Sequence, residues 1–246
     1  MMRKVTAIAL AVVSDALRRK VLWAVLVFAA LLAIAIPSLP SYGTGVDAAV
    51  FRDFAIALTF AASLVVVIAL SVTRVPAEVE RRTVFTILGR DVARWQYLVG
   101  TWLGIVLVMV GVELAFLAVT LGIGWLTYGE PAFQLAEASL AILLECGIVA
   151  AFCIMITARL GAVTGAVAAL AFLFVGHSVA SLVGGGVEGA KAPWWVPSLD
   201  VFNVINPVAH GSGISVSYVG AMLAAFGVWC AILLLGGAAL FQGRDL

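Results

Sequence analysis

Long apolar stretches follow one another along the chain, and most are long enough to cross a lipid bilayer as a helix. Hydrocarbon about 30 Å thick requires roughly 20 apolar residues of helix for each crossing. The stretches lie near Val21–Ile36, Phe54–Val72, Leu98–Trp125, Leu135–Ala158, Ala162–Val183 and Ile214–Phe241. The pattern therefore predicts an all-α membrane protein with six transmembrane helices, built as a single domain over residues 1–246.

Composition and charge support this prediction and orient the chain. Hydrophobic residues make up 64% of the sequence and charged residues 11%, which excludes an ordinary soluble domain. If the N-terminus is cytoplasmic, all but two of the fourteen basic residues fall on that side, the exceptions being Arg52 and Lys191. Cytoplasmic loops collect Lys and Arg, and six spans return the chain to its starting side. We therefore expect both termini in the cytoplasm.

The segment before the first span, residues 3–19, allows two interpretations. A basic start and an apolar stretch are typical of a signal peptide. Against this, a basic run and a full span follow at once, and apolar residues recur at helical spacing. The members of that stripe are Val5, Ile8, Ala9, Val12 and Ala16. We favour an uncleaved helix that lies along the inner membrane surface.

A charged segment, residues 74–96, separates the second span from the third. It holds five of the fourteen basic residues in a chain that is mostly apolar. Pro76 can open a helical turn, Gly89 can end it, and Asp91 can cap the next helix. An apolar group between arginines suits docking of a soluble partner, although a merely solvated positive loop explains the charges as well.

The residues of this segment add a resemblance. Glu78-Val79-Glu80-Arg81-Arg82-Thr83 and the following residues to Gly100 resemble the loop between spans two and three of type-2 ABC transporter permeases. The likeness is greatest to the branch that contains the permease of nitrous-oxide reductase maturation. Asp91 replaces the family's usual proline and can still start a helix, as a cap. Thr101 replaces the family's lysine, which removes one charge at the inner face and leaves the implied fold unchanged. The motif covers about 25 residues, and the remaining likeness is architectural.

This resemblance implies a permease subunit, an exporter of a bacterial inner membrane, that pairs with a second permease copy or a paralogue. It implies docking through a cytoplasmic coupling helix onto a separate ATPase, which would bind ATP and Mg²⁺. The chain itself has no P-loop motif, so we expect no enzyme activity and no cofactor in it. Lipid and, in some systems, an extracytoplasmic accessory protein are the other expected partners; no nucleic acid is expected. The implied ATPase-coupling residues are Glu78, Glu80, Arg81, Arg82, Thr83, Phe85, Leu88 and Arg94.

Three ionisable residues fall inside predicted spans: Glu113, Glu145 and His177. Each lies about 13 to 15 residues, roughly 20–22 Å, from the cytoplasmic end of its span. Charged groups at such depth usually face a bundle interior or a wet cavity. They are candidates for a transport path, either as one polar cluster or, in the simpler alternative, as three separately hydrogen-bonded groups. With only His177 and His210 present and no ligand spacing, a metal site is not expected.

The predicted loop 184–213 is long and has an apolar middle, which favours a segment dipping into the outer interface over a plain linker. We expect Pro197 and Asn206-Pro207 to break it. The three cysteines lie in spans as apolar filler.

Two alternatives to the permease remain. One is a secondary transporter or channel for protons or cations that uses the Glu113, Glu145 and His177 cluster. The other is an intramembrane hydrolase, for which the chain lacks a nucleophile motif.

Overall fold

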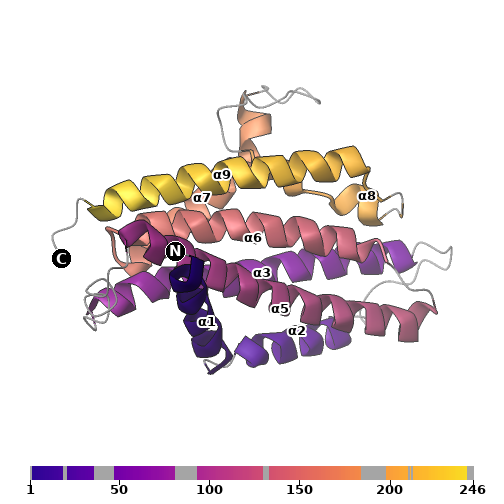
Figure 1. Cartoon of the computed structure of the whole chain (residues 1–246). Helices are drawn as coiled ribbons and strands as arrows, with labels where there is room; N and C mark the ends of the chain where they lie inside the picture. Colours follow the sequence, from indigo (N-terminus) through magenta and orange to yellow (C-terminus); the bar gives the residue numbers. More distant parts are fainter. Residues whose placement is uncertain are drawn as a thin grey trace.

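The computed structural model describes residues 2–18, 21–35, 47–80, 93–129, 133–183, 198–209, 211 and 213–242. Almost all of these residues are helical, and there is no strand among them. In chain order the helices are α1 (Met2–Arg18), α2 (Val21–Ala35), α3 (Asp47–Glu80), α5 (Arg94–Tyr128), α6 (Leu135–Thr157), α7 (Ala162–Val183), the 3-10 helix η2 (Leu199–Phe202), α8 (Ile205–Ala209) and α9 (Val216–Gln242). Figure 1 shows the long helices running side by side in one bundle.

Five helices, α3, α5, α6, α7 and α9, are long and apolar enough to cross a membrane. The predicted all-α, multi-pass membrane protein is confirmed at this level. The first expected span corresponds to α2, whose 15 residues extend about 22 Å and fall short of the hydrocarbon thickness. The described residues thus provide five spans and one shorter apolar helix.

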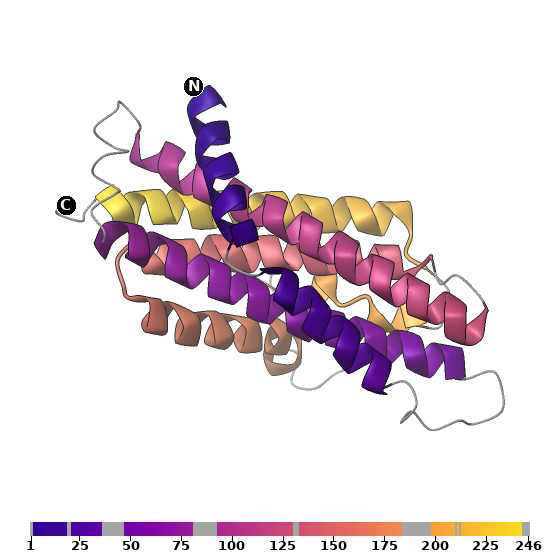
Figure 2. The same ribbon diagram turned by 90° about the horizontal axis from the view of Figure 1, so that it is seen from below.

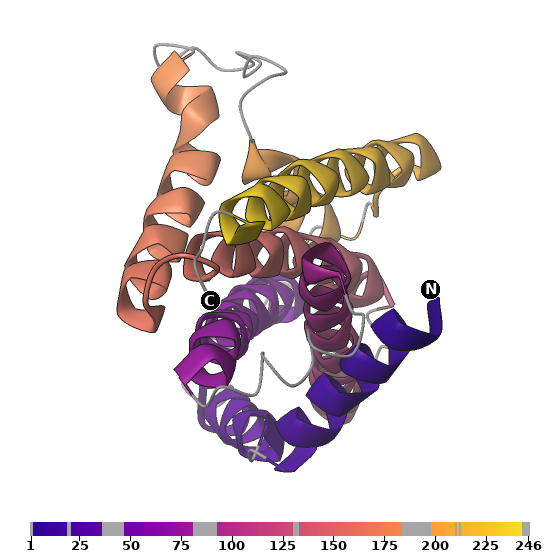
Figure 3. The same ribbon diagram turned by 60° about the vertical axis from the view of Figure 1, so that its left-hand side comes forward.

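The centre of the bundle is α6. In its most apolar window, 72% of the residues are buried inside the protein, against 17% for α9. It packs against α3, α5, α7 and α9, and Figure 3 shows α6 between α9 on one side and α3 on the other. Residues buried on α6 therefore meet side chains from most of the other helices, and this helix carries Glu145.

Helix α1 lies across the bundle rather than along it, as Figure 2 shows. Its buried residues, Ala9, Val12 and Ala16, belong to the predicted apolar stripe. The crossing is close because α5 presents Gly100 and Gly104: a Cβ at Gly104 would lie 2.6 Å from the Cβ of Val12. The orientation across the bundle is the one that a helix at a membrane surface would have.

The junctions of the charged segment differ from expectation. Pro76 lies inside α3 instead of opening a new helix. The ring of Pro76 removes one backbone N–H donor from the helix. Because this costs only one hydrogen bond, close to the end of the helix, α3 continues past Pro76 to Glu80. Helix α5 begins after Ala93 and not at Asp91, and the Gln96 side-chain oxygen accepts a hydrogen bond from the Ala93 N–H at 3.1 Å. Residues 81–92, the middle of the predicted coupling hairpin, lie outside the described residues.

Candidate functional site: a polar pocket and a charged end cluster

Two of the three ionisable residues predicted inside the spans meet directly. The Nε2 atom of His177 on α7 lies 2.8 Å from Oε1 of Glu145 on α6. The Glu145 side chain is 2% exposed and that of His177 is 30% exposed. Burying a carboxylate without a partner is costly, so the imidazole provides a partner for Oε1 of Glu145 and links α6 to α7.

The third residue, Glu113 on α5, has a different partner. The hydroxyl of Ser63 on α3 donates a hydrogen bond to its Oε1. Its Oε2 is buried and has no hydrogen-bond partner among the described residues. The structure therefore brings Glu145 and His177 together and places Glu113 in a separate pair.

The two pairs nevertheless lie at one level of the bundle. Phe60 contacts His177 edge-on, with ring centroids 5.8 Å apart, and Phe60 precedes Ser63 by three residues on α3. Three residues correspond to about 4.5 Å along a helix. Both pairs thus contact adjacent turns of α3, in agreement with the equal depth expected from the sequence.

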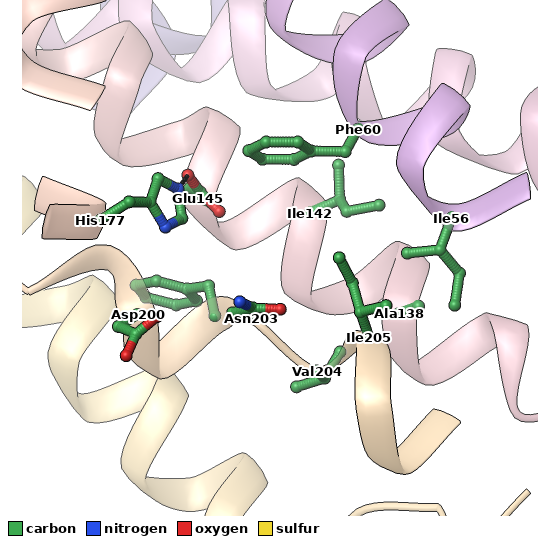
Figure 4. A pocket seen from close by; sticks show the side chains of 11 residues that line it. Ile56, Phe60, Ala138, Ile142, Glu145, His177, Asp200, Asn203, Val204 and Ile205 are labelled. Carbon is green, nitrogen blue, oxygen red and sulfur yellow. Dashed lines mark hydrogen bonds and ion pairs between the residues drawn. The ribbon is translucent and has the colours of Figure 1, made fainter. Parts of the chain in front are cut away.

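A pocket of about 290 Å³ opens beside the Glu145–His177 pair. We call it the polar pocket, and Figure 4 shows the pair at one end and Ile56 toward the other. Helices α3, α6, α7 and α8 and the η2 segment all contribute to its wall. The lining residues are Ile56, Phe60, Ala138, Ile142, Glu145, His177, Asp200, Phe202, Asn203, Val204 and Ile205. Most of the residues that line the polar pocket are apolar and a few are polar, which is the composition common in ligand-binding sites.

Two polar lining residues, Asp200 and Asn203, were not predicted as site residues. They belong to the loop 184–213, whose described part folds onto the bundle as η2 and α8, with Leu199 and Phe202 buried. Asn203 follows the last residue of η2, and its N–H donates a hydrogen bond to the Asp200 carbonyl oxygen at 3.0 Å, which holds the two residues close together. Two polar residues three positions apart, with apolar neighbours on both sides of each, are the signal that could have identified them.

Proline does not break this segment where the sequence predicted. Asn206 and Pro207 lie inside α8, in its first turn, where the missing N–H of proline has no helical partner to lose. Pro197, the other expected break, lies outside the described residues.

Helices α6 and α9 hold this segment in place. The Tyr218 hydroxyl on α9 donates a hydrogen bond to the Val201 carbonyl oxygen at 2.7 Å. The Glu137 carboxylate on α6 accepts a hydrogen bond from the Ile214 N–H at 2.7 Å. Both bonds position the chain that carries Asp200.

A second group of charged side chains lies where α1, α3 and α5 meet, far along α3 from the polar pocket. Arg74 pairs with Asp15 of α1 and, at 2.7 Å, with Glu78 one turn further along α3. The Tyr97 hydroxyl of α5 donates a hydrogen bond to Glu78 at 2.5 Å. We call Asp15, Arg74, Glu78 and Tyr97 the end cluster. It ties three helices together at the base of the charged segment.

Arg94 makes a similar connection between α5 and α9. Its guanidinium donates a hydrogen bond to the Phe241 carbonyl oxygen at 2.8 Å and lies over the Phe241 ring. Glu78 and Arg94, both implied as ATPase-coupling residues, therefore have partners within the chain. The other implied residues, Arg81, Arg82, Thr83, Phe85 and Leu88, and the side chain of Glu80, lie outside the described residues.

Within the described ranges, no group of three His, Cys, Asp or Glu residues is placed to hold a metal ion. His210 lies outside those ranges. Cys146, Cys153 and Cys230 are buried free thiols, as expected for apolar filler.

Comparison with known proteins adds no relative: neither a protein-family model nor a curated protein matches the chain. The resemblance to type-2 ABC permeases consequently rests on the residues of the charged segment.

Proposed function

We propose that the chain is the membrane subunit of an ABC exporter in a bacterial inner membrane, driven by a separate ATP-binding subunit. In this proposal the apolar stretch near Val21–Ile36 is a sixth span, both termini are cytoplasmic, and two permease subunits pair. The observation that carries the proposal is the sequence from Glu78 to Gly100, which resembles the ATPase-docking loop of such permeases.

The surroundings of that loop support a mechanical role. A coupling element must pass the motion of a partner to the transmembrane helices, which requires stiff attachment at both of its ends. The end cluster holds the end of α3 to α1 and α5, and Arg94 holds the start of α5 to the end of α9. On this view Glu78 and Arg94 position the loop, while Phe85, Leu88 and the flanking Arg81 and Arg82 contact the ATPase.

The test is co-purification of this chain with the partner ATPase that the proposal requires, which its P-loop motif would identify. The double substitution Phe85→Asp and Leu88→Asp should abolish the complex, because two carboxylates would enter an apolar contact. Leu126 and Phe133 are a matched control pair, exposed by 86% and 69% at the opposite end of the bundle; their substitution by Asp should leave the complex intact. An unchanged yield of complex with the Phe85 and Leu88 substitutions would refute this docking role.

The Glu145–His177 pair beside the polar pocket favours a second candidate, a secondary transporter or channel for protons or cations. The two candidates differ in their energy source. Proton uptake by liposomes that contain this chain alone, without ATP or an ATPase, would favour the second candidate, and transport strictly dependent on the ATPase would favour the first.

A further inference from the structure

The polar pocket carries an excess of negative charge. Glu145 and Asp200 are acidic, and none of its eleven described lining residues is Lys or Arg. His177 is the only basic residue among them and can offset at most one of the two acidic groups. The part of the chain that the structure describes thus offers more acidic than basic groups to whatever enters.

The acidic groups are arranged to receive a ligand rather than only each other. Glu145 uses Oε1 for His177, and among the described residues its Oε2 has no hydrogen-bond partner. Asp200 lies on η2 below the Glu145–His177 pair in Figure 4, and Asn203 follows it on the same segment and also lines the pocket. Two carboxylates and the Asn203 amide oxygen thus line one pocket and can accept hydrogen bonds from a ligand group with several N–H donors.

The remaining walls are apolar and aromatic. Ile56 and Ile142 face the pocket from α3 and α6, and two aromatic residues, Phe60 and Phe202, also line it. Aromatic faces attract cations, most strongly where water is excluded. The same walls would cover the hydrocarbon part of an amphipathic ligand.

The volume limits the size of such a ligand. An apolar cavity of about 150 Å³ accommodates benzene. The 290 Å³ of the polar pocket is roughly twice that volume, which suits a molecule of about a dozen non-hydrogen atoms.

We propose that the polar pocket binds a small organic cation, a protonated amine on an aromatic or aliphatic body, with the ammonium group between Glu145 and Asp200 and the body against Ile56, Phe60 and Ile142. The inference that this cation is transported rests on the proposed function. The inference that the polar pocket binds it does not. It concerns residues on α3, α6, α7 and η2 and requires no ATPase.

The test uses the full chain alone in lipid nanodiscs. Tryptamine is the probe, and tryptophol, which has a hydroxyl in place of the amine and the same number of non-hydrogen atoms, is the neutral control. Binding is measured by isothermal titration against empty nanodiscs, which corrects for partition into lipid. Tryptamine should bind at least about tenfold more tightly than tryptophol, a difference of about 1.4 kcal/mol.

Substitutions then locate the binding site. Asp200 is exposed, so Asp200→Asn should fold normally and weaken tryptamine binding about tenfold while leaving tryptophol unchanged. Asp53→Asn, which removes an exposed acid of α3 that does not line the pocket, should leave both affinities unchanged. Glu145→Gln, which keeps a hydrogen-bonding group beside His177, should also weaken tryptamine selectively.

The possible results separate clearly. Absence of saturable tryptamine binding, or equal affinity for tryptamine and tryptophol, overturns the proposal while leaving the ATPase-docking experiment unaffected. Equal loss of affinity in the Asp200 and Asp53 variants overturns the proposed location of the binding site.

An ammonium group also occurs in phosphatidylethanolamine, so the natural ligand could be a lipid headgroup or a free amine. If adding this lipid to phosphatidylglycerol nanodiscs weakens tryptamine binding, the natural ligand is a lipid headgroup. If it does not, the ligand is a free amine.

Discussion

The end cluster and the polar pocket are both groups of charged side chains on an apolar bundle, and they differ in what surrounds them. In the end cluster Arg74 lies between two acids, Asp15 and Glu78. The space beside Asp15 and Arg74 is only about 20 Å³, against 290 Å³ at the polar pocket. The first group has almost no free space beside it, and the second faces a volume that a ligand could fill.

This difference indicates whether each group contributes to stability or to ligand binding. A set of opposite charges without free space can only hold its helices together, and removing one member takes from the others a charge with which they pair. A pair such as Glu145 and His177 at the wall of a cavity satisfies itself in part and keeps capacity for a ligand. We therefore expect substitutions in the end cluster to change stability most and substitutions at the polar pocket to change binding most.

The largest effect is expected from Arg74→Ala. Asp15 and Glu78 would lose their cation, and the free energy of unfolding should fall by about 3 kcal/mol, at the lower end of the range for such losses because Asp15 is 36% exposed. Unfolding in mixed micelles during an SDS titration provides the measurement. Tryptamine binding by the folded variant should be unchanged.

Arg159→Ala is the matched control for this substitution. Arg159 is an exposed arginine in the α6–α7 turn at the same end of the bundle, so its removal should change the free energy of unfolding by less than about 0.5 kcal/mol. Equal effects of the two substitutions would show that the end cluster does not hold α1, α3 and α5 together.

A smaller effect is expected at the other buried pair, Ser63 and Glu113. Ser63→Ala removes the hydroxyl that satisfies Oε1 of Glu113 and should cost about 1–3 kcal/mol, because both carboxylate oxygens would then be buried without a partner. Combining it with Glu113→Leu should restore most of the loss, since no unpaired polar group remains. The same SDS titration measures both; a double variant as unstable as Ser63→Ala would exclude this explanation.

How much the sequence could foresee depends on whether a feature is local. The stripe on residues 3–19 predicted the buried face of α1, since helical periodicity alone determines which residues share a face. Equal depth of Glu113 and Glu145 followed from counting residues along each span. Which partner each would meet did not follow, because this depends on the rotation of each helix about its own axis.

The helix boundaries that the sequence predicted wrongly also depend on packing between helices. A proline near the end of a long helix costs one hydrogen bond, and packing of α3 against α5 and α6 outweighs the local preference for a new start at Pro76. Asp200 and Asn203 entered the candidate site only because the loop that carries them packs back onto the bundle. Long-range packing of this kind leaves little trace in a single sequence.

The smallest effects on stability and on binding are expected from Tyr218→Phe, because Tyr218 both joins two elements and supports a residue of the polar pocket. The lost hydrogen bond to the Val201 carbonyl oxygen joins α9 to the η2 segment that carries Asp200.

Tyr218 is 36% exposed, so water can replace its hydroxyl and the free energy of unfolding should change by less than about 1 kcal/mol. The Glu137 bond to Ile214 still holds the segment from its other side, which limits the displacement of Asp200. Tryptamine affinity should therefore fall only about two- to threefold, measured by isothermal titration as for Asp200→Asn. Tyr128→Phe, at the end of α5 and outside the pocket lining, should change neither quantity. A loss of stability without any loss of affinity would place Tyr218 with the end cluster, among the residues that only hold helices together.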